Sequence, residues 1–254
     1  MTAVPGTPPV ANALAGRVIA ITGASGGIGR AVALAAAAHG ARLILLGRSV
    51  RRLTETHTEV TRLHGDVALM APIDFEKALA GDYDRIAAAV METYGRLDGL
   101  VHCAGMLGTL TPIEGYDVPT WFKVMHVNVT AAFALTQVLL PALRLSPSAS
   151  IVFTTSSVGR QGRAYWGAYA ASKFAIEGMS QVLADETSGS TNIRVNALNP
   201  GRTRTAMRRQ AFPSEELESL PLPEQVAMPY VALLSEASGG VTGGSFDCQA
   251  PAPR

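Results

Sequence analysis

The sequence predicts an α/β fold in which a doubly wound parallel sheet of about seven strands is covered by helices on both faces. Short uninterrupted apolar runs alternate with amphipathic stretches along the chain, and a glycine-rich segment follows the first run directly. Such apolar runs are typical of strands buried on both faces, and their alternation with helices is typical of parallel sheets. With 254 residues, 48% of them apolar, the chain is long enough to bury one large core.

Each apolar run is a predicted strand, and each amphipathic stretch is a predicted helix. The strands are expected at residues 18–21, 43–46, 67–73, 100–103, 151–153, 193–198 and around Phe246. The helices are expected at residues 30–39, 84–94, 120–143 and 168–186. No internal repeat or linker divides the chain, so residues 15–250 are expected to form a single domain. Within it, residues 206–229 are rich in proline toward their end, which predicts a mobile loop bordering the substrate.

Composition excludes several classes of protein. The first 14 residues contain three prolines and lack the pattern of a secretion signal, so they are expected to form a disordered tail. A formal net charge of +1 gives no electrostatic reason to expect nucleic acid or an anionic membrane as partner. The two cysteines, Cys103 and Cys248, are far apart, which is typical of a reduced cytoplasmic protein. No histidine has the spacing of a metal site, and no metal is expected.

The glycine-rich segment Thr22–Gly29 predicts a dinucleotide site, and hence a Rossmann-type fold. Glycine lets the backbone adopt positive φ and approach a pyrophosphate, while the N-terminus of the following helix attracts the anion. The glycines fit the pattern TGxxxGxG through Gly23, Gly27 and Gly29, and equally TGxxGxxG with Gly26 as the middle glycine. A simple tight turn between strand and helix is the alternative to a phosphate site.

The end of the second predicted strand indicates the choice of cofactor. An acidic residue there would bind the ribose 2′-hydroxyl of NAD, whereas an arginine suits the 2′-phosphate of NADP. The sequence places Gly47 at the position of the acid and Arg48 directly after it. We therefore expect NADP(H) to be preferred over NAD(H), with a solvated surface arginine as the alternative reading of Arg48.

Tyr169 and Lys173 form a candidate catalytic pair. Their i, i+4 spacing places the phenol and the ammonium on one face of a predicted helix. A phenol has a pKa of about 10 in isolation, and a nearby cation is expected to lower that pKa by about two to three units. Such a phenol can donate a proton to a carbonyl oxygen while a hydride reaches the carbon. By itself the YxxxK pattern is common, so its value depends on the residues around it.

A hydroxyl cluster at the end of the strand predicted at 151–153 precedes this pair. Ligands in open α/β sheets bind at the carboxyl ends of strands, and a serine there can donate to an oxygen on which charge develops. Ser156 is favoured over Ser157 because it fits both the strand end and the spacing to Tyr169. The alternative for both serines is a hydrogen bond to local backbone. Tyr165 and Trp166, beside Tyr169, are expected to border the substrate.

These motifs together resemble the short-chain dehydrogenase/reductase superfamily, and the resemblance extends from about Gly16 to Phe246. It is carried, in order, by Thr22–Gly29, His102-Cys103-Ala104-Gly105, Asn128, Ser156, Tyr169 with Lys173, and Asn199-Pro200-Gly201. Within the superfamily, residues 156–164, 166–175 and 201–207 are most similar to the YciK-type bacterial oxidoreductases.

The resemblance implies a catalytic tetrad of Asn128, Ser156, Tyr169 and Lys173. In this reading Tyr169 is the general acid/base and Ser156 polarises the substrate oxygen. Lys173 holds the nicotinamide ribose and lowers the pKa of Tyr169. Asn128 positions a water that links Lys173 to solvent.

The resemblance also implies the cofactor-binding residues. They are Gly23, Ser25, Gly27, Ile28, Gly29, Arg48, Asp74, Phe75, Cys103, Ala104, Gly105, Tyr169, Lys173, Pro200, Gly201, Thr203 and Thr205. Asp74 is expected to contact the adenine, whereas Asp66 is expected to be only a turn residue. Cys103 stands where the family has asparagine, which puts its contact with the cofactor in doubt.

The function expected from the resemblance is hydride transfer between NADP(H) and a small carbonyl or alcohol substrate. A homodimer or homotetramer built through the helices that carry Asn128 and Tyr169 is expected. One alternative is an NAD-linked epimerase or dehydratase of the superfamily's longer branch, although the chain after Pro200 is short for that branch's extra lobe. Another is a non-catalytic NADP(H)-sensing module, a class that usually lacks the tyrosine or the lysine. The substrate depends on loops whose shapes the sequence does not determine.

Overall fold

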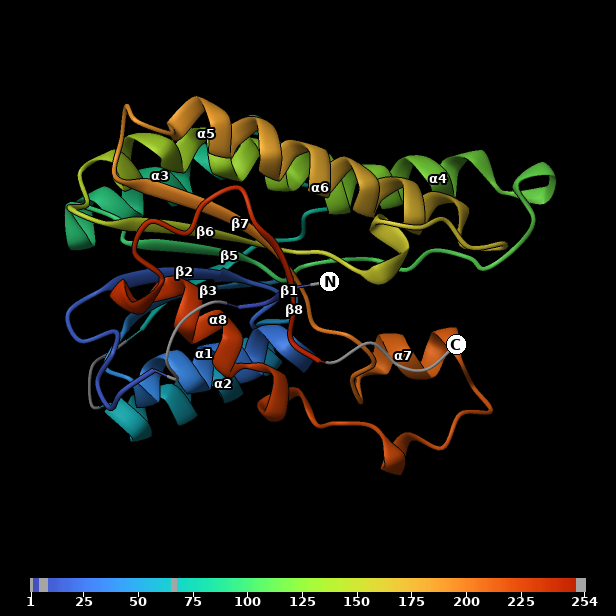
Figure 1. Cartoon of the computed structure of the whole chain (residues 1–254), viewed down its shortest axis with the longest axis horizontal. Coiled ribbons are helices and arrows are strands. Elements are labelled where there is room, and N and C mark those ends of the chain that lie inside the picture. Colours follow the sequence, from blue (N-terminus) through green and yellow to red (C-terminus); the bar gives the residue numbers. More distant parts are fainter. Residues whose placement is uncertain (1, 5–8, 65–67, 250–254) are drawn as a thin grey trace.

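The computed structural model describes residues 2–4, 9–64 and 68–249 of the chain. Asp66, expected to be a turn residue, lies outside the described residues. The architecture is a central parallel sheet with a helical layer on each face, as predicted (Figure 1).

The sheet has eight parallel strands in the order β1-β8-β7-β6-β5-β2-β3-β4. Their bounds are β1 Thr2–Ala3, β2 Val18–Thr22, β3 Arg42–Gly47, β4 Leu69–Pro72, β5 Gly99–His102, β6 Ala149–Thr154, β7 Ile193–Asn199 and β8 Ser245–Asp247. All strands from β2 onward coincide with the predicted apolar runs, because β2, β3, β5, β6 and β7 are almost wholly buried and need apolar side chains on both faces.

Helices cover both faces of this sheet. They are α1 Gly27–Ala38, α2 Val50–His64, α3 Ala80–Tyr94, α4 Val118–Met125, α5 Ala131–Arg144, α6 Gly167–Thr187, α7 Ala206–Ala211 and α8 Met228–Leu234. In Figure 1, α3, α5 and α6 lie on one side of the sheet, and α1, α2 and α8 lie on the other. The chain runs outward from β2 to β4 and then returns to β5, so the order reverses between β2 and β5. Ligands in such sheets bind at this reversal, beyond the carboxyl ends of the strands.

Two described parts of the N-terminal segment, Thr2–Ala3 and Leu14, pack on the fold, which the sequence did not predict. Thr2–Ala3 pairs in parallel with Phe246 and Asp247 of β8, and this adds an edge strand to the expected seven. Leu14 is fully buried, and its amide donates to the carbonyl of His39. The prediction of a disordered tail over residues 1–14 is therefore wrong for these residues, because a two-residue strand and a single buried leucine leave no periodic pattern.

One helical stretch of the described residues, Val118–Arg144, is long and apolar enough to cross a membrane by length and composition. It comprises α4, the π-helical turn η2 (His126–Thr130) and α5. In the structure this stretch packs on the sheet, where Leu135, Leu139 and Leu143 are buried in the core. Its apolar composition therefore follows from its position in the core.

The segment expected to be a substrate loop, residues 206–229, contains more helical structure than predicted. It begins with α7 and includes the 3-10 turns η4 (Leu217–Ser219) and η5 (Pro223–Val226). Leu217, Leu220 and Val226 are buried. The segment thus packs against the domain through its second half.

Candidate active site

The predicted site residues gather at one edge of the sheet. The glycine-rich loop follows β2, Arg48 follows β3, Asp74 follows β4, Ser156 follows β6 and Gly201 follows β7. Because all strands are parallel, these loops meet beyond the same carboxyl ends.

The backbone resolves the two readings of the glycine-rich loop. Gly23 and Gly27 have φ of +69° and +53°, a region that only glycine adopts readily. A Cβ on Gly29 would lie 2.5 Å from the carbonyl oxygen of Gly23, and a Cβ on Gly23 would lie 2.9 Å from the amide nitrogen of Ala104. At Gly26, by contrast, φ is extended and a Cβ would meet no atom within 4 Å. The geometry therefore requires glycine at 23, 27 and 29, the TGxxxGxG pattern.

The N-terminus of α1, which follows this loop, has no side chain of the described residues bound to its free N–H groups. No side chain caps the helix, and its first turn contains no acidic residue. Free N–H groups and the positive end of the helix dipole make such a terminus a site for phosphate. Thr22 Oγ1 accepts hydrogen bonds of 3.0 Å from the amides of Cys103 and Ala104, which fixes the loop after β5 beside the glycine-rich loop.

At the end of β3, Ser25 packs against Gly47, the position where an NAD-binding protein would have an acidic residue. A Cβ on Gly47 would lie 2.0 Å from Ser25 Oγ, so the serine occupies the space that a longer side chain would need. Arg48 is exposed and makes no hydrogen bond or ion pair within the described residues. Arg51, by contrast, is ion-paired with Glu55. Arg48 is thus available to bind an anion.

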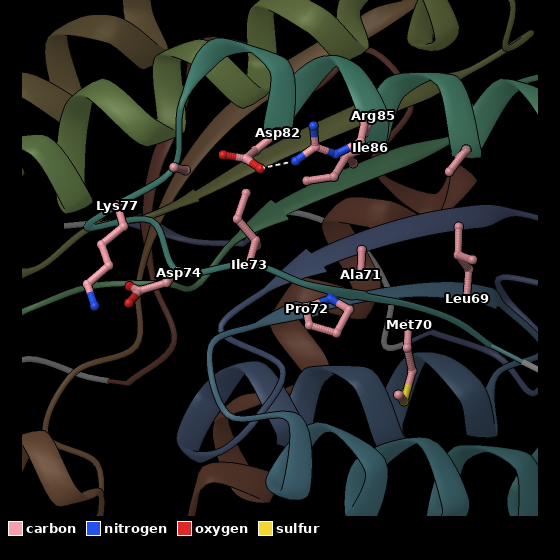
Figure 2. Close-up of a pocket in the computed structure, with 12 residues that line it drawn as sticks. Leu69, Met70, Ala71, Pro72, Ile73, Asp74, Lys77, Asp82, Arg85 and Ile86 are labelled. Carbon is pink, nitrogen blue, oxygen red and sulfur yellow. Dashed lines mark hydrogen bonds and ion pairs between the residues drawn. The ribbon is translucent and has the colours of Figure 1, made fainter.

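Asp74 lies beyond the end of β4, where its carboxylate accepts a hydrogen bond from the amide of Glu76. It borders a cavity of about 430 Å³ between β4 and α3. Figure 2 shows Asp74 at one end of this cavity and the Asp82–Arg85 ion pair on α3 at another. Phe75 is buried and its ring stacks on Tyr83, so any contact of Phe75 with a cofactor would come from its backbone.

Asn128 lies in the π-helical turn η2, and such turns are frequent at functional sites. The side chain is buried and links two neighbouring segments. Its Oδ1 accepts from the amide of Met106 at 2.7 Å, and its Nδ2 donates to Met106 O and to Ser172 Oγ, each at 2.9 Å. A Cβ on Gly105 would lie 3.6 Å from Asn128 Oδ1 and 4.0 Å from Lys173 Nζ, so these three residues are neighbours.

Lys173 and Tyr169 lie on the same face of α6, as their spacing predicts. The ammonium of Lys173 lies 5.6 Å from the centre of the Tyr169 ring and donates to the carbonyl oxygen of Thr154 at 2.7 Å. Burial lowers the pKa of Lys173 to about 8, against the opposing effects of Cys103 and Glu177.

The predicted lowering of the Tyr169 pKa by Lys173 is wrong for this structure. Burial raises the pKa of Tyr169 to about 12, and only the nearby Ser156 hydroxyl opposes that rise. Desolvation disfavours the phenolate, and the ammonium of Lys173 is engaged by a backbone carbonyl.

Ser156 lies near Tyr169, and its hydroxyl lowers the pKa of the phenol. It is partly buried at the start of the 3-10 turn Ser157–Gly159, where its Oγ also accepts from the amide of Val158 at 3.5 Å. Ser157 is exposed. Of the two serines, only Ser156 affects the pKa of Tyr169 in this structure, and its catalytic role stays a prediction.

The segment after β7 lies next to the glycine-rich loop, although the two are far apart in the sequence. Gly201 has φ of +75°, and the hydroxyl of buried Thr203 donates to its carbonyl. Thr205 accepts from the amide of Arg208 and thereby caps α7. A Cβ on Gly27 would lie 3.6 Å from Thr205 Cγ2, so this segment, which begins at Pro200, faces the glycine-rich loop.

Cys103 is turned toward β6. Its Sγ lies 3.3 Å from Thr154 Oγ1, which lies 3.1 Å from the hydroxyl of Tyr230. Burial raises the pKa of the Cys103 thiol to about 11. This thiol–hydroxyl chain joins β5, β6 and α8, so any contact of Cys103 with a cofactor would come from its backbone.

The mouth of the site contains residues that the sequence did not identify. The Trp166 ring lies 5.8 Å from the Tyr169 ring, edge to face, and 5.7 Å from the ring of Phe212 at the end of α7. The guanidinium of Arg163 lies over both Trp166 and Phe212. No local motif indicates Phe212 or Arg163, because their proximity depends on how the segment after β7 folds back.

Three comparisons with known proteins agree with this geometry. The family model for short chain dehydrogenases matches residues 17–216. The oxidoreductase YciK of Escherichia coli strain K12 is 46% identical over 241 residues, which cover 95% of each chain.

Solved structures give the same result. A short-chain dehydrogenase from Shigella flexneri complexed with NADP is similar with a TM-score of 0.92 and 45% identity, covering 95% of this chain and 100% of that one. A short-chain dehydrogenase from Escherichia coli CFT073 complexed with NADPH has a TM-score of 0.92 and 46% identity, with the same coverage. The chain therefore belongs to the short-chain dehydrogenase family and is an oxidoreductase that acts on an alcohol or carbonyl group with a nicotinamide cofactor.

Proposed function

We propose that the protein is an NADP(H)-dependent carbonyl reductase, or the reverse alcohol dehydrogenase, with Tyr169 as general acid/base. The observation that carries this proposal is the position of the Tyr169 phenol. It lies near Ser156, whose hydroxyl lowers its pKa, and near Lys173, whose ammonium is 5.6 Å from the centre of its ring, at the edge where the glycine-rich loop and the segment after β7 meet.

The residues present fit a dinucleotide. The tight glycine cradle, the uncapped helix terminus and the unpaired Arg48 each match one part of it. Gly23, Ser25, Gly27, Ile28 and Gly29 would hold the pyrophosphate, Arg48 the 2′-phosphate, and Asp74 with the Phe75 backbone the adenine. The nicotinamide end would be held by Cys103, Ala104, Gly105, Tyr169, Lys173, Pro200, Gly201, Thr203 and Thr205. When bound, NADPH supplies the hydride that reduces the carbonyl carbon.

The protein's own residues supply the proton and the stabilisation of charge. The Ser156 hydroxyl donates a hydrogen bond to the carbonyl oxygen as negative charge develops on it. The Tyr169 phenol, whose raised pKa keeps it protonated well above neutral pH, donates the proton that completes the alcohol. The Lys173 ammonium stabilises the phenolate that remains, and Asn128 fixes the loop at Met106 and the helix at Ser172 around the pair. In the reverse direction the phenolate accepts the proton.

The alternatives have less support from the structure. The epimerase or dehydratase reading drew on the ambiguity of the glycines, and the open space around Gly26 favours the TGxxxGxG pattern. A sensing module without turnover has no use for the contact between Ser156 and Tyr169.

We infer further that the protein is a cytoplasmic homo-oligomer. Four large apolar side chains on α4, α5 and α6 are exposed, namely Phe122 (66%), Phe133 (51%), Phe174 (46%) and Val182 (60%). Exposed apolar side chains gathered on neighbouring helices favour burial against a second copy.

The proposed function is tested by following NADPH absorbance with a panel of aldehydes, ketones and 3-oxoacyl thioesters. Consumption of NADPH that depends on one of these carbonyl compounds is the expected result. A panel that yields no turnover with NADPH or NADH, with protein shown to bind cofactor, would contradict the proposal.

A further inference from the structure

A cluster of three aromatic rings lies at the mouth of the site. Trp166 packs edge to face on Tyr169, with ring centres 5.8 Å apart, and Phe212 lies 5.7 Å from Trp166 on its other side. We call Trp166 and Phe212 the aromatic mouth. An apolar part of a substrate whose carbonyl reaches Tyr169 can therefore lie against these rings.

Two guanidinium groups cover the aromatic mouth, and one of them is neutralised. Arg208 lies 3.8 Å from the centre of the Phe212 ring, and both its Nε and its Nη2 donate to the carboxylate of Glu215 at 2.5 Å. These hydrogen bonds lower the pKa of Glu215, which keeps the carboxylate charged. The charge of Arg208 is therefore balanced within the protein.

Arg163 is the other guanidinium, and its charge is not balanced. Its Cζ lies 5.8 Å from the centre of the Trp166 ring and 5.4 Å from that of Phe212. Among the residues that the structure describes, no carboxylate lies within 4.0 Å of it. Arg160, in the same loop, instead binds Glu177 at 3.0 Å and Asp247 at 2.9 Å. Of these two arginines, Arg160 anchors the fold. Within the described residues, Arg163 presents an unpaired cation over Trp166, the ring that packs on Tyr169.

The backbone between Arg163 and Trp166 is held in a turn of limited freedom. Tyr165 has φ of +72°, a conformation that is strained for a non-glycine residue and persists where the surroundings impose it. The carbonyl of Tyr165 accepts from the amide of Thr111, and the amide of Trp166 donates to the carbonyl of Arg163. The turn therefore fixes Arg163 and Trp166 relative to the loop after β5.

We propose that the carbonyl substrate carries an anionic group, a carboxylate or a phosphate, that Arg163 binds while the aromatic mouth holds the apolar part. A guanidinium presents a planar fork of donors that matches both anions, and such charge-assisted hydrogen bonds are stronger than neutral ones. This inference rests on the proposed function of the site at Tyr169 and adds to it the chemical class of the substrate.

The test compares three aromatic aldehydes that differ only in the para substituent. 4-Carboxybenzaldehyde and 4-formylphenyl phosphate carry the two anions, and methyl 4-formylbenzoate is the neutral control. With NADPH, the wild-type protein is expected to show a higher kcat/KM for at least one anion than for the ester. Arg163→Gln is expected to lower that value by about 10- to 100-fold, the range of a charge-assisted hydrogen bond, and to leave the ester within about twofold. The anion whose kcat/KM falls more in Arg163→Gln identifies whether Arg163 binds a carboxylate or a phosphate.

Two control variants separate binding from net charge and from packing. Arg144→Gln, at the exposed end of α5, removes the same charge from a distant site. It is expected to leave kcat/KM unchanged for all three aldehydes. Arg163→Lys keeps the cation and is expected to retain part of the preference for the anion. Equal losses on anion and ester with Arg163→Gln would show that Arg163 only packs the aromatic mouth, and would overturn the proposal.

A binding measurement distinguishes failure of this inference from failure of the proposed function. Calorimetric titration of the NADP⁺ complex with 4-(hydroxymethyl)benzoate, 4-(hydroxymethyl)phenyl phosphate and methyl 4-(hydroxymethyl)benzoate needs no turnover. The anion site is supported if the carboxylate or the phosphate binds more tightly than the ester and Arg163→Gln abolishes that difference. If this holds while no aldehyde is reduced, only the proposed function fails. Reduction of the aldehydes without any preference for an anion supports the proposed function and overturns the anion site.

Discussion

Among single residues, Tyr169 and Lys173 show how burial adjusts a proton donor. Burial raises the pKa of Tyr169 to about 12 and lowers that of Lys173 to about 8, because each group is less stable charged when removed from water. At neutral pH the phenol is therefore protonated and most of the lysine is charged, the combination that carbonyl reduction needs. The sequence identifies both residues by their spacing but not the direction of the tyrosine shift, which depends on how deeply α6 is packed.

A pH dependence follows from these pKa values. Reduction should lose rate as pH rises through about 8, because Lys173 then loses the charge that stabilises the phenolate, while Tyr169 stays protonated to higher pH. The kcat/KM for reduction, measured from pH 6 to 10, is expected to fall on the alkaline side. In Lys173→Arg, whose side chain stays charged over this range, the fall should disappear or move to higher pH, whatever activity remains. A profile unchanged by this substitution would assign the ionisation to another group.

The choice of cofactor also depends on single residues. NADPH should bind more tightly than NADH, and Arg48→Ala should lose most of that preference, about 10- to 100-fold for an arginine–phosphate contact. Because a Cβ on Gly47 would collide with Ser25 Oγ, Gly47→Asp should favour NADH only together with Ser25→Gly. Titration by nicotinamide fluorescence measures each affinity, with Arg51→Ala as the control because Arg51 is paired with Glu55. Equal affinity of the wild-type protein for both cofactors would contradict this assignment.

Among the elements, strands were predicted better than loops. The strands from β2 onward follow from apolar runs because strands buried on both faces leave a continuous local signal. The strand β1 follows from no such signal, because its two residues pair with β8 at the other end of the chain. The aromatic mouth was predicted only in part, because one of its two rings comes from a distant part of the sequence. Trp166 adjoins a recognisable motif, whereas Phe212 contacts it only because the segment after β7 folds back toward α6.

The π-helical turn η2 places Asn128 between the loop after β5 and helix α6. Asn128→Ala should leave the Met106 amide without its acceptor, at about 1–3 kcal/mol for a buried polar group, while the Ser172 hydroxyl loses one donor but still donates to the Tyr169 carbonyl. The melting temperature should therefore fall by roughly 2–10 °C, together with the rate. Thermal unfolding monitored by circular dichroism measures this, with exposed Asn192→Ala as the control. A rate loss with unchanged stability would assign Asn128 to catalysis alone.

For the whole molecule, the proposed assembly through α4, α5 and α6 can be tested directly. Light scattering after size exclusion should give the mass of a dimer or a tetramer. Phe133→Glu combined with Phe174→Glu should shift the mass toward the 26.5 kDa monomer, because each places a charge on the exposed apolar face. Val50→Glu, at an exposed valine of α2, is the control and should leave the mass unchanged. A wild-type protein that is monomeric at micromolar concentration would contradict the proposed assembly.

The most direct test of the central claim is single-turnover hydride transfer at saturating NADPH in Tyr169→Phe. This substitution removes only the hydroxyl, so the fold and NADPH binding should survive while the rate falls by about 10²–10⁴-fold, the usual contribution of general acid catalysis. Ser156→Ala should cost about 10²–10³-fold, and the two losses should not multiply because both residues act on one oxygen. Near-normal hydride transfer in Tyr169→Phe would contradict the mechanism.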